Sequence, residues 1–305
     1  MSKINLSVDI AGIKMQNPVT TASGTFGFGL DYLDYFDVNQ LGAVVTKTIT
    51  INRRMGNPPP RIIETPSGLL NSIGLANPGI DEFIQSTLLD LEHIKAPIIV
   101  SIAGDTEEEY VELAERLDKV DKIAGIELNV SCPNVRMGGI QFGVCPEQVN
   151  RLTKASAAAT QKPLIVKLTP NVTDIVEVAC AAVEGGARSL SLINTLLGMS
   201  IDINKRKPVL ANNVGGLAGP AIRPVAVRMV WQVAQAVDVP IIGVGGICDY
   251  RDALEFIMAG AASVGVGTWN FVNPTACVDI IEGLRCFCLE QGVKDINELV
   301  GCSWK

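Results

Sequence analysis

The sequence predicts a single (β/α)8 TIM barrel with an N-terminal β-hairpin below it and long loops over its C-terminal face. Short runs rich in Val, Ile and Leu recur along the 305 residues, each followed by a helical pattern, which is typical of βα units and a parallel sheet. Eight such units favour a closed barrel, because open doubly wound sheets normally stop at about five to seven strands. Two domains of about 150 residues are the alternative, but α/β barrels often form one unit. We therefore expect one barrel domain over residues 1–305.

Each expected strand ends in polar residues or glycine, as barrel strands do where they meet the functional face. In chain order the strands are expected at 19–23, 43–48, 98–103, 125–131, 164–169, 189–195, 241–246 and 263–268. Three connections, residues 49–97, 132–145 and 196–220, are longer than a plain barrel requires. All three follow strands, so we expect them on the C-terminal face, where TIM-barrel active sites lie.

Local signals justify the hairpin and the helices. Apolar residues at 4, 6, 8 and 10 alternate with polar ones, and Ala11–Gly12 offers a turn, so a hairpin is expected to close the bottom of the barrel. Helix starts are expected at the capping residues Thr106, Thr173 and Asp249, and at Pro146, which suits a first helical turn. Helices and strands therefore alternate as a barrel requires.

Composition excludes several classes of protein. The net charge is -7, with 25 Lys and Arg against 32 Asp and Glu, which disfavours a nucleic-acid partner. The longest uncharged run, residues 256–278, is interrupted by Asn, Pro and Gly and is not expected to span a membrane. The N-terminus lacks the basic and apolar blocks of a signal peptide. We therefore expect a cytoplasmic protein with no membrane or nucleic-acid partner.

Metal and histidine chemistry are also disfavoured. The eight cysteines include no CxxC pair, so they are expected to be reduced thiols, with no metal site or iron–sulfur cluster on this chain. The only histidine, His93, is expected on the far side of the barrel from the mouth. Its isolation excludes Ser-His-Asp and Cys-His mechanisms.

Charged and polar residues gather at the expected strand ends. Lys47 and Lys167 close two apolar strands, and a buried lysine is costly unless it faces an anionic partner. An ordinary ion pair is the alternative for either lysine alone, but the two together favour a negatively charged ligand at the barrel mouth. The other residues expected there are Ser23, Thr48, Ser101, Asn129, Cys132, Asn194, Thr195, Gly245, Gly246, Gly267 and Thr268.

Glycine-rich backbone ends the last two expected strands, as GVGG at 243–246 and GVGT at 265–268. Such backbone can bring N–H groups close to phosphate oxygens, although tight βα turns are the alternative for each run. Neither run has the G-x-G-x-x-G spacing that opens a Rossmann helix. A bound phosphate is therefore expected, but direct binding of NAD by this chain is not.

Cys132 is the candidate for base or nucleophile. It follows an apolar strand, lies between Asn129 and Asn134, and precedes a glycine-bearing loop. Neighbouring lysine charge can supply the matched thiol pKa that either role needs, whereas a small buried hydrophobe is the alternative. Because histidine mechanisms are excluded, a base, if one is needed, is expected to be Cys132.

Four asparagines, Asn71, Asn129, Asn134 and Asn194, are expected on the same face. Their carboxamides offer both donors and acceptors, as an amide- or imide-bearing ring requires. A single loop asparagine is most often a turn residue, so the prediction depends on convergence with the two lysines. We expect a substrate rich in carbonyl and N–H groups that carries an anionic group.

Ten motifs stand along the chain in the order TASGTFGFG, TKTIT, NSIGLANPG, NVSCPN, GGIQFG, VKLTPNV, INTLLGMSIDI, GGLAGPAI, GVGGI and GVGTW. With these motifs, and over essentially its whole length, the chain resembles the class 1 dihydroorotate dehydrogenases. The GGIQFG and NTLLGMSIDI segments are most similar to class 1B, the NAD-linked form, and to its catalytic subunit. Two positions differ from the usual family residues: Ala76, which is often polar, and Ser101, which is often asparagine.

The resemblance implies oxidation of (S)-dihydroorotate to orotate in pyrimidine biosynthesis, with one FMN in the barrel mouth. Cys132 matches the catalytic base, which removes a ring proton while hydride passes to the flavin. Because reduced flavin carries negative charge, Lys167 is expected to stabilise it, and Lys47 is expected to pair with charge on flavin or substrate. The positions that match the orotate site are Lys47, Asn71, Ile73, Gly74, Leu75, Asn129, Asn134, Asn194 and Thr195. The positions that match the FMN site are Ser23, Lys47, Thr48, Ser101, Asn129, Lys167, Ile193, Gly219, Gly245, Gly246, Gly267 and Thr268.

Class 1B enzymes are similar in using a second subunit, which carries FAD and a [2Fe–2S] cluster, to pass electrons to NAD. We therefore expect a heterotetramer with two copies of each chain. Three alternatives stay open: a class 1A homodimer that reduces fumarate, a flavin barrel that acts on another dihydropyrimidine, and a non-catalytic ligand-binding barrel. Activity with fumarate, activity with dihydrouracil, and insensitivity to loss of the Cys132 thiol would distinguish them.

Overall fold

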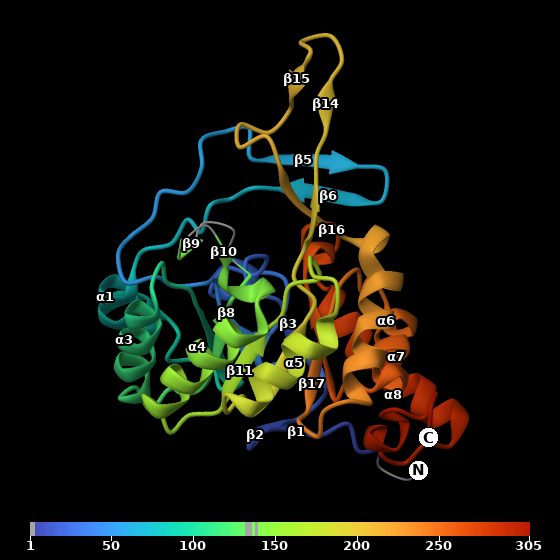
Figure 1. Cartoon of the computed structure of the whole chain (residues 1–305). Coiled ribbons are helices and arrows are strands. Elements are labelled where there is room, and N and C mark those ends of the chain that lie inside the picture. The colour runs from blue at the N-terminus through green and yellow to red at the C-terminus, as the bar shows by residue number, and fades with distance from the viewer. Residues whose placement is uncertain (1–3, 132–135, 138–139) are drawn as a thin grey trace.

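Eight parallel strands form a barrel surrounded by helices (Figure 1). The computed structural model describes residues 4–131, 136–137 and 140–305. A parallel bridge between Thr20 and Ala43 joins the first strand to the second and closes the ring. The (β/α)8 prediction is confirmed, and all eight expected strands are present. In order around the barrel they are β3 (Val19–Thr21), β4 (Val44–Val45), β7 (Ile98–Ile102), β8 (Ile123–Asn129), β11 (Leu164–Lys167), β12 (Ser189–Leu192), β17 (Ile241–Val244) and β18 (Ser263–Val266).

Helices cover the outside of the barrel between successive strands. After β3 the described chain forms only 3-10 turns, η1 (Leu30–Tyr32) and η2 (Val38–Gln40). The segment after β4 combines α1 (Ile80–Glu82), the π-helical turn η3 (Phe83–Thr87) and α2 (Leu88–Asp90). The longer helices are α3 (Glu107–Asp118), α4 (Pro146–Ala158), α5 (Ile175–Glu184), α6 (Arg223–Ala234), α7 (Tyr250–Ala259) and α8 (Ala276–Gln291).

Three of the four predicted helix starts are confirmed. Thr106 caps α3, Pro146 opens α4, and Asp249 caps α7 in a capping box with Asp252. The predicted Thr173 cap of α5 is wrong. Asp174 takes this place because its backbone is extended and its carboxylate accepts a hydrogen bond from the N–H of the second helical residue.

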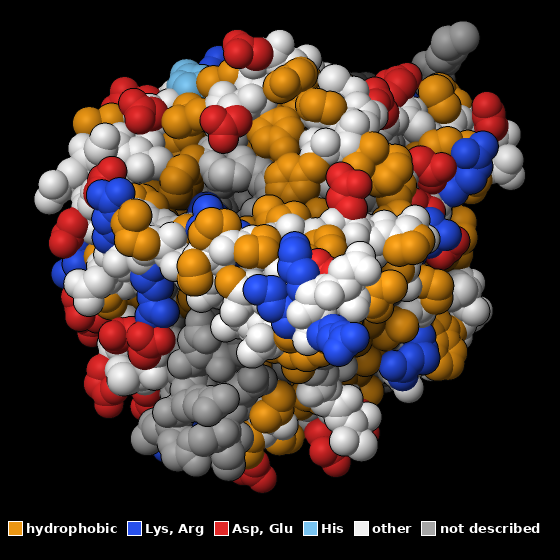
Figure 2. All heavy atoms as spheres, turned by 90° about the horizontal axis from the view of Figure 1, so that it is seen from above, with side chains coloured by type: hydrophobic (Ala, Val, Ile, Leu, Met, Phe, Trp, Pro, Cys, Tyr) orange, Lys and Arg blue, Asp and Glu red, His pale blue; other side chains and the backbone are white. Residues whose placement is uncertain are grey.

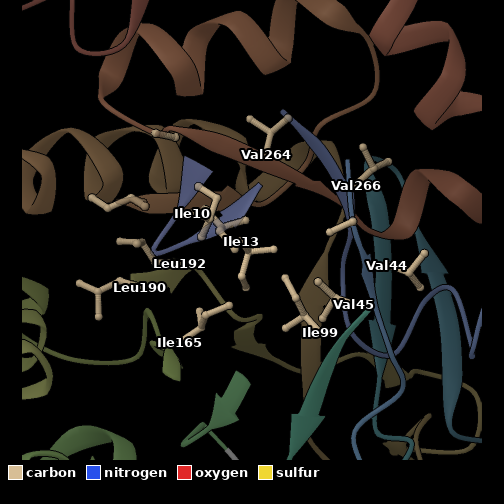
Figure 3. Packing of buried hydrophobic residues seen from close by; sticks show 14 of the residues in the cluster. Ile10, Ile13, Val44, Val45, Ile99, Ile165, Leu190, Leu192, Val264 and Val266 are labelled. Carbon is tan, nitrogen blue, oxygen red and sulfur yellow. The ribbon is translucent and has the colours of Figure 1, made fainter. Parts of the chain in front are cut away.

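The predicted hairpin closes the bottom of the barrel, as β1 (Val8–Ile10) and β2 (Ile13–Met15). Ile10 and Ile13 are buried beside residues of the barrel strands (Figure 3). Gly125, near the start of β8, leaves room for Ile13, whose Cδ1 lies 2.7 Å from where a Cβ at 125 would be. The bottom of the barrel is therefore closed by hydrophobic residues, and the polar strand ends lie at the opposite, C-terminal face.

An antiparallel sheet lies above the C-terminal face, where the sequence predicts loops. It joins two segments that are far apart in the chain, since Gly216 in one pairs with Asn71 in the other. Its strands, in spatial order, are β13 (Leu196–Gly198), β16 (Gly215–Ala218), β6 (Gly68–Asn71) and β5 (Ile62–Thr65). Two small hairpins accompany it: β14 (Ile201–Asp202) with β15 (Lys207–Pro208), which projects upward in Figure 1, and β9 (Arg136–Met137) with β10 (Ile140–Gln141).

No helix among the described residues is both long enough and apolar enough to cross a membrane.

Candidate active site

A buried lysine and a buried carboxylate lie at the C-terminal end of the barrel. Lys167, the last residue of β11, is 5% exposed, and its Nζ donates a hydrogen bond to Ser23 Oγ at 2.9 Å. Glu127 in β8 is 3% exposed, and its Oε1 lies 3.9 Å from Lys167 Nζ. Its Oε2 accepts a hydrogen bond from Ser191 Oγ at 2.8 Å. The barrel thus brings together the predicted Ser23 and Lys167 and adds Glu127 and Ser191.

Sequence reasoning missed Glu127 and Ser191. The available signal was a glutamate inside an otherwise apolar run at 123–128, because a carboxylate is almost never fully buried without a partner. The partner comes from strands that are distant in sequence, so only the folded barrel identifies it.

Lys47 follows β4 and is half-buried at the mouth. Its Nζ is the atom nearest to the space that a Cβ at Gly24 would occupy, at 3.9 Å, so Lys47 and the loop after β3 face the same space. No ion pair joins Lys47 to a carboxylate of the described residues. Burial lowers the pKa of Lys47 below its ordinary value of 10.5, and the positive charge of Arg61 lowers it further. An anionic ligand would relieve both effects.

The predicted carboxamides converge across the barrel mouth. Asn194 Nδ2 donates to Asn129 Oδ1 at 3.3 Å. Asn71 Nδ2 donates to the carbonyl oxygen of Gly216 at 3.2 Å. Thr195 Oγ1 occupies the space that a Cβ at Gly216 would need, so Asn71 and Thr195 lie on either side of this glycine. The sheet above the barrel therefore delivers Asn71 to the site.

The backbone of residues 73–75 leaves three consecutive donors available. In the described structure the N–H groups of Ile73, Gly74 and Leu75 donate no hydrogen bond to protein acceptors. Gly74 and Leu75 both have positive φ, 74° and 55°. The carbonyl oxygens of this loop accept hydrogen bonds from Asn57, whose N–H donates to Ile73 O at 2.9 Å, and from Asn77, whose Nδ2 donates to Leu75 O at 2.7 Å. Free N–H groups of this kind suit a carboxylate.

The predicted glycines of the last strands also come together. Gly246 has a φ of 73°, and a Cβ there would lie 2.6 Å from the carbonyl oxygen of Gly219. A Cβ at Gly245 would lie 3.5 Å from Ile193 Cγ1. Gly267 leads into the 3-10 turn η6 (Thr268–Phe271), with no atom closer than 3.5 Å to its Cβ position. Side chains are excluded after strand seven, since a Cβ at Gly245 would also lie 2.7 Å from Ala226 Cβ, whereas the backbone at Gly267 after strand eight is uncrowded. Glycine backbone at these two strand ends, beside the start of a short helical turn, matches the phosphate site of TIM barrels.

Two further predicted residues pair with each other. Thr48 Oγ1 and Ser101 Oγ lie 3.0 Å apart, and both side chains are buried. Ser101 is in register with Glu127 on the neighbouring strand, which places this pair beside the lysine and carboxylate. The predicted Cys132 and Asn134 lie outside the described residues, so their roles stay predictions.

The face that carries these residues is electrostatically uneven. Figure 2 looks down on it, and Lys and Arg side chains lie across its middle while most Asp and Glu side chains lie nearer the edge. Two lysines, paired carboxamides and open glycine backbone can bind a ligand with an anionic group and a carbonyl-rich ring.

Comparison with known proteins decides the family. The model of the dihydroorotate dehydrogenase family matches residues 5–287. This chain belongs to the dihydroorotate dehydrogenase family. The resemblance predicted from the motifs is thereby confirmed, and enzymes of the dihydroorotate dehydrogenase family are flavin-dependent oxidoreductases.

Two relatives in this family are similar over nearly their whole length. Dihydroorotate dehydrogenase B (NAD(+)), catalytic subunit, from Geotalea uraniireducens is 56% identical over 301 residues, which cover 99% of each chain. The protein of the same description from Alkaliphilus metalliredigens is 57% identical over 301 residues, again 99% of each chain. A crystal structure of DHODH from Eimeria tenella in complex with ferulenol has a TM-score of 0.80 at 23% identity, covering 98% of this chain and 88% of that chain. This last likeness concerns the fold alone.

Replacing Gly246 with alanine is expected to weaken flavin binding to this dihydroorotate dehydrogenase family member by about tenfold or more. The added Cβ combines a positive φ with a contact of 2.6 Å to Gly219 O, so the two loops must separate. Fluorescence titration of FMN into deflavinated protein measures the affinity. Gly12→Ala is the matched control, because its φ is +94° but no atom lies within 4 Å of the Cβ position. Equal FMN affinity in both variants would contradict the prediction.

Proposed function

We propose that this chain is the catalytic subunit of an NAD-linked dihydroorotate dehydrogenase, which oxidises (S)-dihydroorotate to orotate in pyrimidine biosynthesis. The observation that carries the proposal is the convergence of Lys47, Lys167 and the Asn129–Asn194 pair at one end of the barrel. Relatives with this enzymatic name share more than half of the sequence. The whole chain is proposed to act as one domain, and its cytoplasmic location stays a prediction.

FMN fits the residues at the barrel mouth. Gly245, Gly246, Gly267 and Thr268 would hold its phosphate with backbone N–H groups, and Gly219 and Ile193 line the same region. Ser23, Thr48, Ser101, Asn129 and Lys167 would hold the ring. Glu127 Oε1, which lies close to Lys167 and accepts no hydrogen bond from the described residues, marks an unusually polar end of the barrel. When bound, FMN accepts the hydride that leaves the dihydropyrimidine. Lys167 would stabilise the negative charge that this transfer creates.

The substrate is proposed to bind through its two polar ends. The free N–H groups of residues 73–75 and the ammonium of Lys47 would bind the carboxylate. Asn71, Asn129, Asn134, Asn194 and Thr195 would orient the ring by hydrogen bonds to its amide and imide groups. Cys132 would then take the proton from the ring methylene, and the surrounding side chains would hold the reacting carbon in place.

Replacing Lys47 with methionine is expected to weaken orotate binding by about 10- to 100-fold while stabilising the ligand-free protein. The first effect follows from loss of a charge-assisted contact. The second follows because burial lowers the pKa of Lys47, which means that the fold disfavours the charged form. Orotate titration and thermal unfolding measure the two effects.

The stabilising effect of Lys47→Met has a defined pH dependence. Below the folded-state pKa, wild-type Lys47 is charged in both states and the cost of burying it is complete. The cost disappears as pH rises toward 10.5, the value of the free side chain, so wild type and variant should converge in stability there. A variant that is less stable than wild type at pH 7 would contradict this.

The chain is also proposed to require a partner. The description of its relatives as catalytic subunits supports a second subunit, for which we propose FAD, a [2Fe–2S] cluster and NAD as final acceptor. The assembly is proposed to be a heterotetramer with two copies of each chain. Co-elution of both chains at that size in size-exclusion chromatography is the expected result, and separate elution would contradict it.

Anaerobic addition of dihydroorotate to the flavin-loaded chain tests the proposed reaction. Bleaching of the flavin absorbance that is reversed by neither NAD nor fumarate is expected for a catalytic subunit without its partner. Reoxidation by fumarate would instead indicate a class 1A enzyme. Bleaching by dihydrouracil in preference to dihydroorotate would move the assignment to another dihydropyrimidine.

A further inference from the structure

Glu127 is a buried ionisable group for which the proposed reaction has no use. Among the described residues, its Oε2 accepts one hydrogen bond, from Ser191 Oγ, and its Oε1 has no hydrogen-bond partner. The nearest positive charge is Lys167, with Oε1 and Nζ 3.9 Å apart, which is an ion-pair distance but too long for a hydrogen bond. A carboxylate in this condition loses hydration without full compensation from the protein.

The strand register places this carboxylate directly below the barrel mouth. Lys167 is opposite Asn129 in the β8–β11 ladder, and Glu127 precedes Asn129 by two residues on the same strand. Residues two apart in a strand point to the same face, so Glu127 lies one layer deeper than Asn129. Lys167 Nζ therefore lies between the Ser23 hydroxyl, at 2.9 Å, and the Glu127 carboxylate.

Stability does not account for a glutamate at this position. Replacing a buried ion pair by apolar residues of similar volume is often neutral or stabilising, because desolvation of two charges offsets their attraction. The Glu127–Lys167 pair is also imperfect, since the carboxylate oxygen nearest to Lys167 Nζ accepts no hydrogen bond from the described residues. A buried charge pair at the mouth of a barrel, of which one member contacts the proposed cofactor, points instead to an electrostatic role.

We propose that Glu127 is a positioning residue that offsets the positive charge of Lys167 and thereby lowers the reduction potential of the bound flavin. The inference rests on the proposed function, because it assumes a flavin beside Lys167. Ser191 holds the carboxylate in place through its hydrogen bond. The full charge of Lys167 would stabilise reduced flavin, and the carboxylate moderates that stabilisation.

This role matches the acceptor proposed for the enzyme. Electrons that must reach NAD have to leave the reduced flavin easily, so excessive stabilisation of the reduced form would trap them. A lysine alone would favour uptake of hydride at the expense of its onward transfer. The Glu127–Lys167 pair places a positive group at the ring but lowers the net positive charge there. This suits a flavin that is both reduced and reoxidised in each catalytic cycle.

The test is the reduction potential of the flavin in Glu127→Gln, measured by equilibration with a redox dye under slow chemical reduction at pH 7. The variant keeps the shape of the side chain and removes its charge, so the equilibrium is expected to shift about tenfold toward reduced flavin. Glu112→Gln is the matched control, because it removes one charge from an exposed carboxylate on α3 that pairs with Arg116. Its potential should equal that of wild type.

The outcomes separate this inference from the proposed function. The reduction potential is measured without dihydroorotate. Failure of dihydroorotate to bleach the wild-type flavin would therefore contradict the proposed function but not the inference on Glu127. A Glu127→Gln potential equal to or below that of wild type would overturn the inference. If Glu127→Gln does not retain flavin, Glu127→Asp keeps the charge at a greater distance from Lys167, and a small shift in the same direction is expected. No shift, or a shift in the opposite direction, would overturn the inference in that variant as well.

Discussion

Replacing Cys132 with alanine is expected to slow reduction of the flavin by dihydroorotate about a thousandfold. The proposed role of the thiol is to remove the ring proton, and a positioned base contributes roughly 100- to 10,000-fold to such a step. The chain offers no histidine to substitute, because its single histidine is His93, in the turn between α2 and β7. Anaerobic stopped-flow absorbance of the flavin measures the rate.

Cys286→Ala provides the control for the loss of a thiol. Cys286 lies in α8 and is exposed, so its replacement should leave the rate of flavin reduction unchanged. Orotate should still bind to Cys132→Ala, since the carboxamides and Lys47 are intact. A Cys132→Ala variant with a near-wild-type rate would mean that another group is the base, and would favour the interpretation of Cys132 as a packing residue.

Replacing Lys167 with methionine is expected to reduce the same rate by about 100- to 1000-fold and to destabilise the fold. The rate falls because a preorganised positive charge no longer meets the charge that develops during hydride transfer. Stability falls because the buried Glu127 carboxylate loses its positively charged partner, a change that typically costs about 3–5 kcal/mol. Stopped-flow absorbance and chemical denaturation report the two losses separately.

The double variant Lys167→Met/Glu127→Gln distinguishes the two effects. It removes both charges, so stability should return toward the wild-type value while the rate of flavin reduction stays low. Recovery of the rate together with stability would show that Lys167 acts only through the fold. A Lys167→Met variant as stable as wild type would show that Lys167 does not offset the cost of burying the Glu127 charge.

The barrel could be predicted because its signals are local. Each strand is a short run of Val, Ile and Leu that ends in polar residues or glycine. A strand that is buried on both faces of a parallel sheet needs only such a continuous apolar run, which is visible in the sequence. The structure contains a strand in each of the eight expected places, and the capping residues Thr106 and Asp249 act at the expected positions. The predicted helix cap at Thr173 was wrong by one residue. Two adjacent residues can cap α5, and the extended backbone at Asp174 makes this residue the cap.

The sheet above the barrel could not be predicted in the same way. Strands β6 and β16 contain several glycines and few β-branched residues, so neither shows the composition of a strand. Their stability comes from pairing with each other, and that pairing exists only after the barrel has brought the loops after β4 and β12 together. The position of Asn71 against Gly216 is a consequence of this pairing.

The sequence by itself determined the barrel, the polar residues at its strand ends and, through its motifs, the family. Side chains such as Lys47, Lys167, Asn129 and Asn194 are identifiable because polar residues at the ends of apolar strands are costly without a ligand. Only the tertiary structure decided that Lys167 lies between Ser23 and Glu127, with Ser191 behind the carboxylate. These contacts join three strands and the loop after β3, which are separated in the chain. The strength of a charge pair depends on its distance and burial, which local sequence does not encode.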